Sequence, residues 1–271
     1  MKILFFGDIV GRSGREGLIQ SLPALKEKLK PDVILANAEN AASGSGLTIK
    51  IAEELFALGI QCMTLGNHAW GQRELLTAID RDPRIVRPAN YPEGTPGRGL
   101  HLLALPNGKK LLVINLMARL FMEPVLDDPF AALEKILGIH KLSGNLQIFL
   151  DMHGEATSEK MAIAHQFDGR VSAVVGTHTH VPTADQHILP KGTAYQTDVG
   201  MCGDYDSIVG MKKDVAIWRF TRKTPPLERK SPAEGPATIC GTFITTDDVT
   251  GLAVKISPIR VGGILLQAHV D

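Results

Sequence analysis

Two histidines, His178 and His180, stand two residues apart just after an apolar run that leads into Gly176. Residues i and i+2 of an extended segment face the same way, so we expect both imidazoles on one side of the chain. Neutral imidazole is a common metal ligand. Taken alone, a His-x-His pair is as consistent with two hydrogen-bonded loop histidines as with a metal pair. The interpretation therefore depends on what the other strand ends carry.

Five apolar runs of the sequence end in side chains of metal-ligand type. In order these are Asp8, then Glu39 with Asn40, then Asn67 with His68, then Asp151 with His153, and finally His178 with His180. The carboxyl ends of parallel strands meet at one edge of a sheet, where α/β proteins place their working residues. A single Asp or a lone Gly-Asn-His is usually a cap or a turn. Five coinciding ends are hard to produce by chance and predict a metal site.

The elements that must position these residues alternate between strand and helix in the first two thirds of the chain. The last third is mostly strand and loop, so we expect an α/β fold with mixed sheets. Helices are expected at 14–29, 48–58, 72–80, 129–140 and 158–167. Strands are expected at 2–7, 32–38, 61–65, 100–105, 110–116, 146–152, 171–176, 193–197, 237–246 and 252–259.

The length of 271 residues allows one large domain or two small ones. The segment 222–237, with four prolines and dense charge, is the most loop-like part of the chain. The stretch after it is too short for a second domain. We therefore expect a single domain over 1–271, with 222–237 as an exposed loop.

The overall charge is balanced, with 29 basic and 29 acidic residues. This balance argues against long nucleic acid as a partner, but a small phosphate ester needs only a local positive site. No apolar run approaches the roughly 18 residues of a membrane-spanning helix, so no membrane partner is expected. The three scattered cysteines are typical of reduced thiols and favour a cytoplasmic protein. A homo-oligomer stays open.

The strand-end motifs, in this order, resemble those of the calcineurin-like metallophosphoesterase superfamily. They are GDIVG at 7–11, AENAA at 38–42, GNHAW at 66–70, DMHGE at 151–155 and GTHTH at 176–180. Two positions depart from the usual pattern, because Val10 replaces the histidine of Asp-x-His and Glu39 replaces the bridging aspartate. These departures, with the surrounding sequence, resemble the YmdB-like bacterial branch over the whole chain.

This resemblance implies a four-layer α/β/β/α sandwich, in which two facing mixed sheets carry helices on their outer sides. It also implies a di-metal phosphodiesterase acting on small 2′,3′-cyclic nucleotides, with iron as the first expectation for the two ions and manganese as the alternative. Two metals about 3.5–4 Å apart can share an attacking hydroxide and hold the phosphate oxygens.

The ligand set carries over position by position. Metal one would be held by Asp8, Glu39, Asn40 and His180, and metal two by Glu39, Asn67, His153 and His178. Glu39 would bridge with one oxygen on each ion, and Asn40 would substitute for the missing histidine. Nitrogen and oxygen donors without sulfur suit iron, manganese or similar ions. His68 would donate a proton to the leaving oxygen, with loop orientation as its alternative role.

Other functions remain open at this point. A phosphomonoesterase or nucleotidase would use the same metals, and a non-enzymatic metal-binding regulator would keep the site without turnover. An amidohydrolase is disfavoured, because its His-x-His normally ends the first strand of a barrel and here the motif comes late. Tyr205, in the segment 200–207, is a candidate for stacking on a nucleobase.

Overall fold

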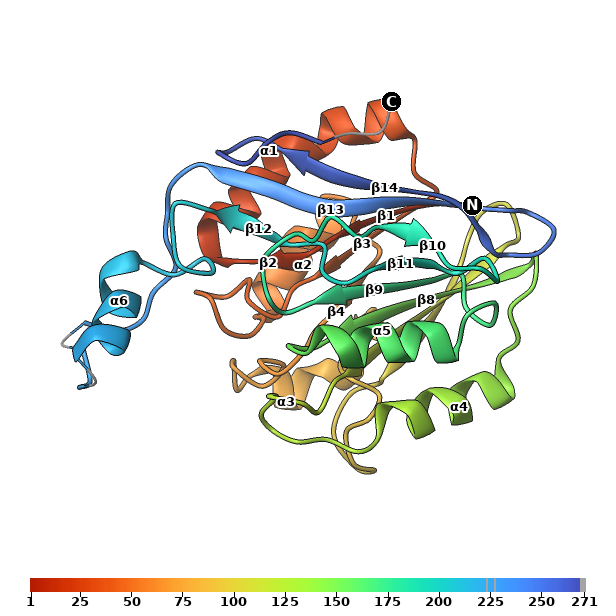
Figure 1. Cartoon of the computed structure of the whole chain (residues 1–271), viewed down its shortest axis with the longest axis horizontal. Coiled ribbons are helices and arrows are strands. Elements are labelled where there is room, and N and C mark those ends of the chain that lie inside the picture. Colours follow the sequence, from red (N-terminus) through yellow and green to blue (C-terminus); the bar gives the residue numbers. More distant parts are fainter. Residues whose placement is uncertain (223, 227, 269–271) are drawn as a thin grey trace.

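The computed structural model describes residues 1–222, 224–226 and 228–268, and its strands form two sheets that face each other (Figure 1). The first sheet has the order β2-β12-β13-β1-β3-β4-β5, and β14 pairs with β13. Its strands are β1 (Lys2–Phe6), β2 (Asp8–Ile9), β3 (Val33–Asn37), β4 (Cys62–Thr64), β5 (Ile85–Val86), β12 (Met201–Asp204), β13 (Ala237–Thr246) and β14 (Ala253–Val261). The strands β1, β3, β4 and β5 are parallel neighbours, whereas β13 is antiparallel to β1.

The second sheet is also mixed. It consists of β6 (Leu100–Ala104), β7 (Lys110–Met117), β8 (Leu146–His153), β9 (Ala173–Thr177), β10 (His187–Ile188) and β11 (Ala194–Gln196). The order is β10-β11-β9-β8-β7-β6. The four inner strands pair in parallel, and both edge strands pair antiparallel. The carboxyl ends of β8 and β9 therefore lie side by side.

Alternating side chains divide the core into layers. On β1, Phe5 lies between the sheets, where its ring centroid is 4.9 Å from that of Phe149 on β8. Its neighbours Leu4 and Phe6 point the other way and pack in the cluster beneath the helices of the first sheet. Because successive residues of a strand face opposite sides, an apolar run without alternation can serve two layers.

Helices cover the outer faces of both sheets. Beside the first sheet lie α1 (Gly11–Leu29), α2 (Ile49–Ala57), α3 (Leu75–Ala78) and the short η1 (Ile79–Arg81). Beside the second lie α4 (Pro129–Ile139) and α5 (Thr157–Gln166). The expected four-layer α/β/β/α sandwich is confirmed, and because both sheets share one core we propose a single domain. No helix in the described part of the chain combines the length and apolar character that a membrane crossing requires.

The sequence missed four short strands (β2, β5, β10 and β12) and the helix α6 (Lys213–Arg222). A strand of two to four residues is too short to show a period, and α6 packs little against the body, since Val215 is its one buried residue. The helix α6 projects from the body (Figure 1). In the segment 222–237, the described residues are mostly exposed loop, as expected, but Pro232 returns to pair with Met211.

Candidate metal centre

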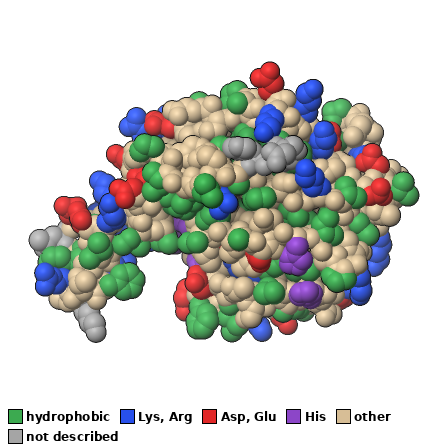
Figure 2. Space-filling view, turned by 45° about the horizontal axis from the view of Figure 1, so that its top comes forward, with side chains coloured by type: hydrophobic (Ala, Val, Ile, Leu, Met, Phe, Trp, Pro, Cys, Tyr) green, Lys and Arg blue, Asp and Glu red, His purple; other side chains and the backbone are tan. Residues whose placement is uncertain are grey.

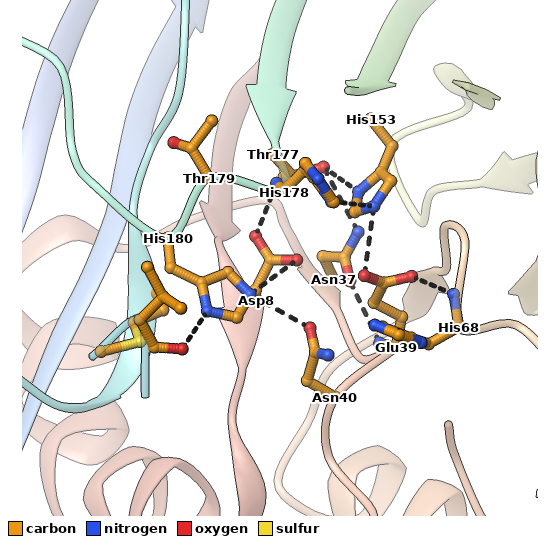
Figure 3. Close-up of polar contacts among 12 residues, drawn as sticks. Asp8, Asn37, Glu39, Asn40, His68, His153, Thr177, His178, Thr179 and His180 are labelled. Atoms are coloured by element: carbon orange, nitrogen blue, oxygen red, sulfur yellow. Dashed lines mark hydrogen bonds and ion pairs between the residues drawn. The ribbon is translucent and has the colours of Figure 1, made fainter. Parts of the chain in front are cut away.

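All the predicted site residues lie in one connected group, where the carboxyl ends of the two sheets meet. Figure 3 labels all of them except Asn67. The first sheet supplies Asp8 at the start of β2, the loop residues Glu39 and Asn40 after β3, and Asn67 and His68 after β4. The second sheet supplies His153 at the end of β8 and the two histidines after β9. The strand-end positions of the sequence thus come together in space.

Three of the predicted ligands converge on the imidazole of a fourth, His153. Its Nε2 lies 2.9 Å from Asn67 Oδ1, 3.1 Å from Glu39 Oε1 and 3.2 Å from His178 Nδ1. The ligand atoms of Glu39, His153 and His178 all lie within 4.8 Å of one another, close enough to share one ion. These are the residues expected for metal two.

The tautomer of His153 follows from its other nitrogen. His153 Nδ1 lies 2.8 Å from Thr177 Oγ1, and the Thr177 hydroxyl donates to Asp151 Oδ1 at 2.7 Å. Thr177 must then accept from the Nδ1–H of His153, so the neutral imidazole, the form that binds a metal, has its lone pair on Nε2 facing the other ligands. Asp151, a strand-end acid, lies behind His153 and orients it through Thr177. The same-side spacing of 151 and 153 on β8 is the sequence signal for this role.

A second group surrounds His180. Its Nε2 lies 3.3 Å from Asn40 Oδ1 and 3.8 Å from Asp8 Oδ1. Its Nδ1–H donates to the Val209 carbonyl at 2.9 Å, so Nε2 carries the lone pair. The amide nitrogen of Asn40 donates to the Gly44 carbonyl at 3.1 Å, which turns the amide oxygen toward His180. The substitution of Asn40 for the missing histidine stays a prediction, for which the amide oxygen is suitably oriented.

One carboxylate oxygen of Asp8 is left without a hydrogen bond in the described part of the chain. Its Oδ2 accepts from the backbone N–H of His178 at 3.1 Å, but its buried Oδ1 has no hydrogen-bond partner in the described part of the chain. Burial raises the pKa of Asp8 to about 6, against the opposing charges of His180 and His153. The protein alone thus compensates this carboxylate poorly, which fits a cation beside it.

The charges of the other group are also consistent with a metal site. Burial acts to lower the pKa of His153, but Glu39 outweighs it and raises that pKa to about 9. Burial acts to raise the pKa of Glu39, but the charged His153 and the backbone N–H of His68 lower that pKa to about 2. An ion at His153 Nε2 would displace the proton held there. Burial, with the neighbouring His153, lowers the pKa of His178 to about 3. A carboxylate and a neutral imidazole are the forms that bind metal ions. The donor set therefore fits divalent first-row ions.

The two oxygens of Glu39 are not equivalent. Oε1 faces His153, whereas Oε2 accepts from the backbone N–H of His68 at 2.8 Å (Figure 3). One hydrogen bond leaves Oε2 with a further lone pair, so it does not prevent Oε2 from binding an ion. Bridging through Glu39 stays a prediction.

The loop after β9 is not extended, and our expectation of two imidazoles facing the same way was wrong. His178 has φ 105° and His180 has φ 65°, both in the left-handed region that is uncommon for residues other than glycine. The amide between them, that of Thr179, donates to Asp198 Oδ2 at 3.0 Å. Each imidazole therefore points to a different ligand group.

A pocket of about 410 Å³ opens beside the ligands. Its lining includes four predicted ligands, Glu39, Asn40, His178 and His180, together with His68, Val181, Val209, Met211 and Lys230. Figure 2 shows a hollow between the projecting α6 and the body, with histidine at its inner edge. A larger hollow of about 830 Å³ lies beside α4 and contains none of the predicted ligands.

Tyr205 does not line this pocket, so the suggested stacking on a base is not supported. Its hydroxyl donates to the His180 carbonyl at 2.9 Å and accepts from the Met201 amide at 2.8 Å. The residue therefore supports the backbone of a predicted ligand.

Comparison with known proteins identifies the chain. A family model described as YmdB-like protein matches residues 4–259. The chain belongs to the YmdB-like family. It is 50% identical over 261 residues to the 2′,3′-cyclic-nucleotide 2′-phosphodiesterase of Bacillus subtilis, covering 96% of this chain and 97% of that protein.

Two solved structures share the YmdB-like architecture closely. A hypothetical protein from Thermus thermophilus is 42% identical, with a TM-score of 0.90, covering 97% of this chain and 100% of that one. A protein from Mycoplasma pneumoniae described as a novel phosphatase is 34% identical, with a TM-score of 0.90, covering 97% and 93%. The fold of this YmdB-like chain is thus the fold of experimentally solved relatives.

The buried pair Lys160–Asp198 supports the histidine loop of this YmdB-like chain. Lys160 Nζ lies 3.2 Å from Asp198 Oδ2 and 3.2 Å from the Thr177 carbonyl, and both charged side chains are fully buried. Lys160→Met would leave the carboxylate of Asp198 buried without its counter-charge. We expect it to lower the free energy of unfolding by about 3–5 kcal/mol, measured by urea denaturation.

The surface pair Arg170–Glu134, with side chains 38% and 58% exposed, provides the matched control. Arg170→Met should cost at most about 1 kcal/mol, because exposed ion pairs contribute little. Equal losses in the two variants would contradict the role given to Lys160.

Proposed function

We propose that this YmdB-like chain is a metal-dependent phosphodiesterase that opens 2′,3′-cyclic nucleotides, with His68 as the proton donor. The observation that carries the proposal is the convergence of nitrogen and oxygen donors on His153 and His180, beside a pocket that also holds His68. The name of the Bacillus subtilis relative supports the cyclic-nucleotide substrate.

Two groups of residues would hold the ions. Asn67, Glu39, His153 and His178 would hold one, and Asp8, Asn40 and His180 the other, with Glu39 as the proposed bridge. Iron is the first expectation and manganese the alternative, because the donors are nitrogen and oxygen without sulfur. When bound, divalent ions supply positive charge to the phosphate and activate a water molecule.

The remaining chemistry belongs to the chain's own residues. Hydrolysis joins a water oxygen to phosphorus and breaks one ring P–O bond, leaving an alkoxide that must take up a proton. The ring of His68 lies in the pocket, and the hydrogen bond from its backbone N–H to Glu39 fixes its position. Burial lowers the pKa of His68, and the negative charge of a bound phosphate would oppose that shift. His68 would then give its proton to this alkoxide, and the apolar Val181, Val209 and Met211 would face the nucleobase.

A phosphomonoesterase acting at the same site is the second candidate function, favoured by the description of the Mycoplasma pneumoniae relative as a phosphatase. It would use the same ligands and the same proton donor. The two functions differ in the substrates that the pocket accepts, so a substrate panel separates them.

The test combines metal analysis with that panel. The chain is purified without added metal, its ions are counted by mass spectrometry, and it is assayed with 2′,3′-cyclic AMP, 3′,5′-cyclic AMP and 5′-AMP. We expect about two first-row ions per chain and selective opening of the 2′,3′ ring. Cleavage of 5′-AMP alone would favour the phosphatase. Absence of activity after iron or manganese is added back would refute both.

A further inference from the structure

The loop 222–237 places one charged side chain, that of Lys230, in the pocket beside the predicted ligands. Lys230 lines this pocket together with His68 and Met211, and like most of its loop it is also exposed to solvent. Lys230 is the lysine among the lining residues, and it lies far in sequence from every predicted ligand. The motif pattern therefore gave no reason to place it at the site.

Backbone pairing holds Lys230 in this position. The residue directly precedes the segment 231–233, which pairs with the segment 210–212 on the pocket wall. The two backbone hydrogen bonds of this pairing run from Lys212 N to Ser231 O, at 3.0 Å, and from Ala233 N to Gly210 O, at 2.9 Å. The backbone next to Lys230 is therefore held by hydrogen bonds, which fixes where its side chain begins.

The same segments are tied to two predicted metal ligands. The carbonyl of Val209 accepts from His180 Nδ1–H at 2.9 Å. On the other side, Pro232 packs so closely on Gly44 that an added Cβ there would come within 3.0 Å of it. The carbonyl of Gly44 in turn accepts from Asn40. Lys230 is thus placed relative to the ligands by short, direct connections.

The charge of Lys230 is not compensated by a nearby acid. No carboxylate lies within ion-pair distance of its ammonium group in the part of the chain that the structure describes. Burial lowers the pKa of Lys230, and Arg219, another cation, adds to this lowering. The exposed acid of the pocket, Glu155, lies 3.4 Å from His178 Nε2 instead. A cation held in a pocket without a counter-charge is suited to an anionic ligand.

We propose that Lys230 binds the phosphate group of the substrate in the pocket that it lines together with four predicted metal ligands. Lysine acts on phosphate as a compact point charge with three donors. The inference rests on the proposed function for the identity of the substrate. It adds a residue that determines substrate affinity independently of the ions.

Lys230→Met tests this role, because methionine keeps most of the side-chain length and removes the charge. We expect KM for 2′,3′-cyclic AMP and the inhibition constant of inorganic phosphate both to rise about 10- to 100-fold, the effect of losing a charged hydrogen bond. Turnover at saturation should change much less. Lys230→Arg should recover most of the lost affinity, since it restores the positive charge.

Arg229→Met is the matched control. It removes one positive charge from the neighbouring position of the same loop, and Arg229 does not line the pocket. Its KM and inhibition constant should equal those of the unmodified chain, and so should the metal content of every variant. Unchanged constants in Lys230→Met, or a loss of metal from it, would overturn the proposal.

A binding measurement separates this inference from the proposed function. Inorganic phosphate is titrated calorimetrically into the metal-loaded chain and into its Lys230→Met variant. If the unmodified chain opens no cyclic nucleotide, the proposed function fails, and weaker phosphate binding by the variant still supports Lys230. Equal phosphate affinities would refute the role of Lys230 whatever the substrate.

Discussion

Glu39→Ala is expected to remove bound metal and nearly all phosphodiesterase activity. Its Oε1 lies 3.1 Å from His153 Nε2 among the proposed ligands, and its Oε2 accepts from the backbone N–H of His68 at 2.8 Å. The substitution therefore deletes a negatively charged donor and releases the loop that carries the proton donor. The loss of several kcal/mol of transition-state stabilisation corresponds to a fall in kcat/KM of about 10³-fold or more.

Two further variants make this result interpretable. Glu39→Gln keeps the shape of the buried side chain and its acceptor for the His68 amide, so it separates loss of charge from loss of fold. Glu155→Gln removes an acid that is 51% exposed and lies in the same pocket, outside the proposed ligand set, and it should keep its metal. Ion counts and thermal unfolding are measured for all three. A Glu39→Ala variant that retains two ions per chain would refute the proposed bridge.

The positions of the site residues could be predicted because parallel strands align their carboxyl ends. Asp8, Glu39, Asn67, His153 and His178 each follow an apolar run, and the two sheets bring these ends together. The layer structure was also visible in the pattern, since strands buried on both faces are nearly continuous apolar runs. Here the local sequence and the tertiary arrangement agree.

The backbone of the histidine loop could not be predicted from spacing. The positive φ angles of His178 and His180 depend on partners distant in sequence: Asp8 accepts from the His178 amide, and Asp198 accepts from the Thr179 amide. Period-two reasoning assumes an extended chain, and β9 ends at Thr177. Contacts with residues outside the loop override the local preference.

The roles of Asp151 and Lys230 could not be predicted from the sequence, for two different reasons. Asp151 has the residue type of a ligand, but its three partners, Thr64, Asn37 and Thr177, occupy both oxygens away from the other donors. Lys230 sits in a loop whose composition indicates only exposure, and its placement depends on the pairing of 231–233 with 210–212. Residue type alone does not separate a ligand from the residue that orients one.

His68→Ala should keep the metal content and lose most turnover. The contact of His68 with Glu39 is made by the backbone N–H, which alanine retains, and the ring's one contact with a predicted ligand is a long one, 3.5 Å from Asn67 Nδ2. The ligand group should therefore stay in place. Only the ring, which lines the pocket, is removed. We expect kcat for 2′,3′-cyclic AMP to fall about 10²–10⁴-fold, the usual contribution of a positioned proton donor. His187→Ala, which removes an exposed imidazole on β10, serves as the control and should match the unmodified chain.

Leaving-group chemistry distinguishes proton donation by His68 from mere loop orientation. An alkoxide needs a proton as the P–O bond breaks, whereas p-nitrophenolate leaves readily without one, because efficiency depends on the acidity of the leaving group. With bis(p-nitrophenyl) phosphate, the defect of His68→Ala should therefore shrink to about tenfold or less. A defect of equal size on both substrates would assign His68 to loop orientation, since a displaced ligand loop slows every reaction at the site alike.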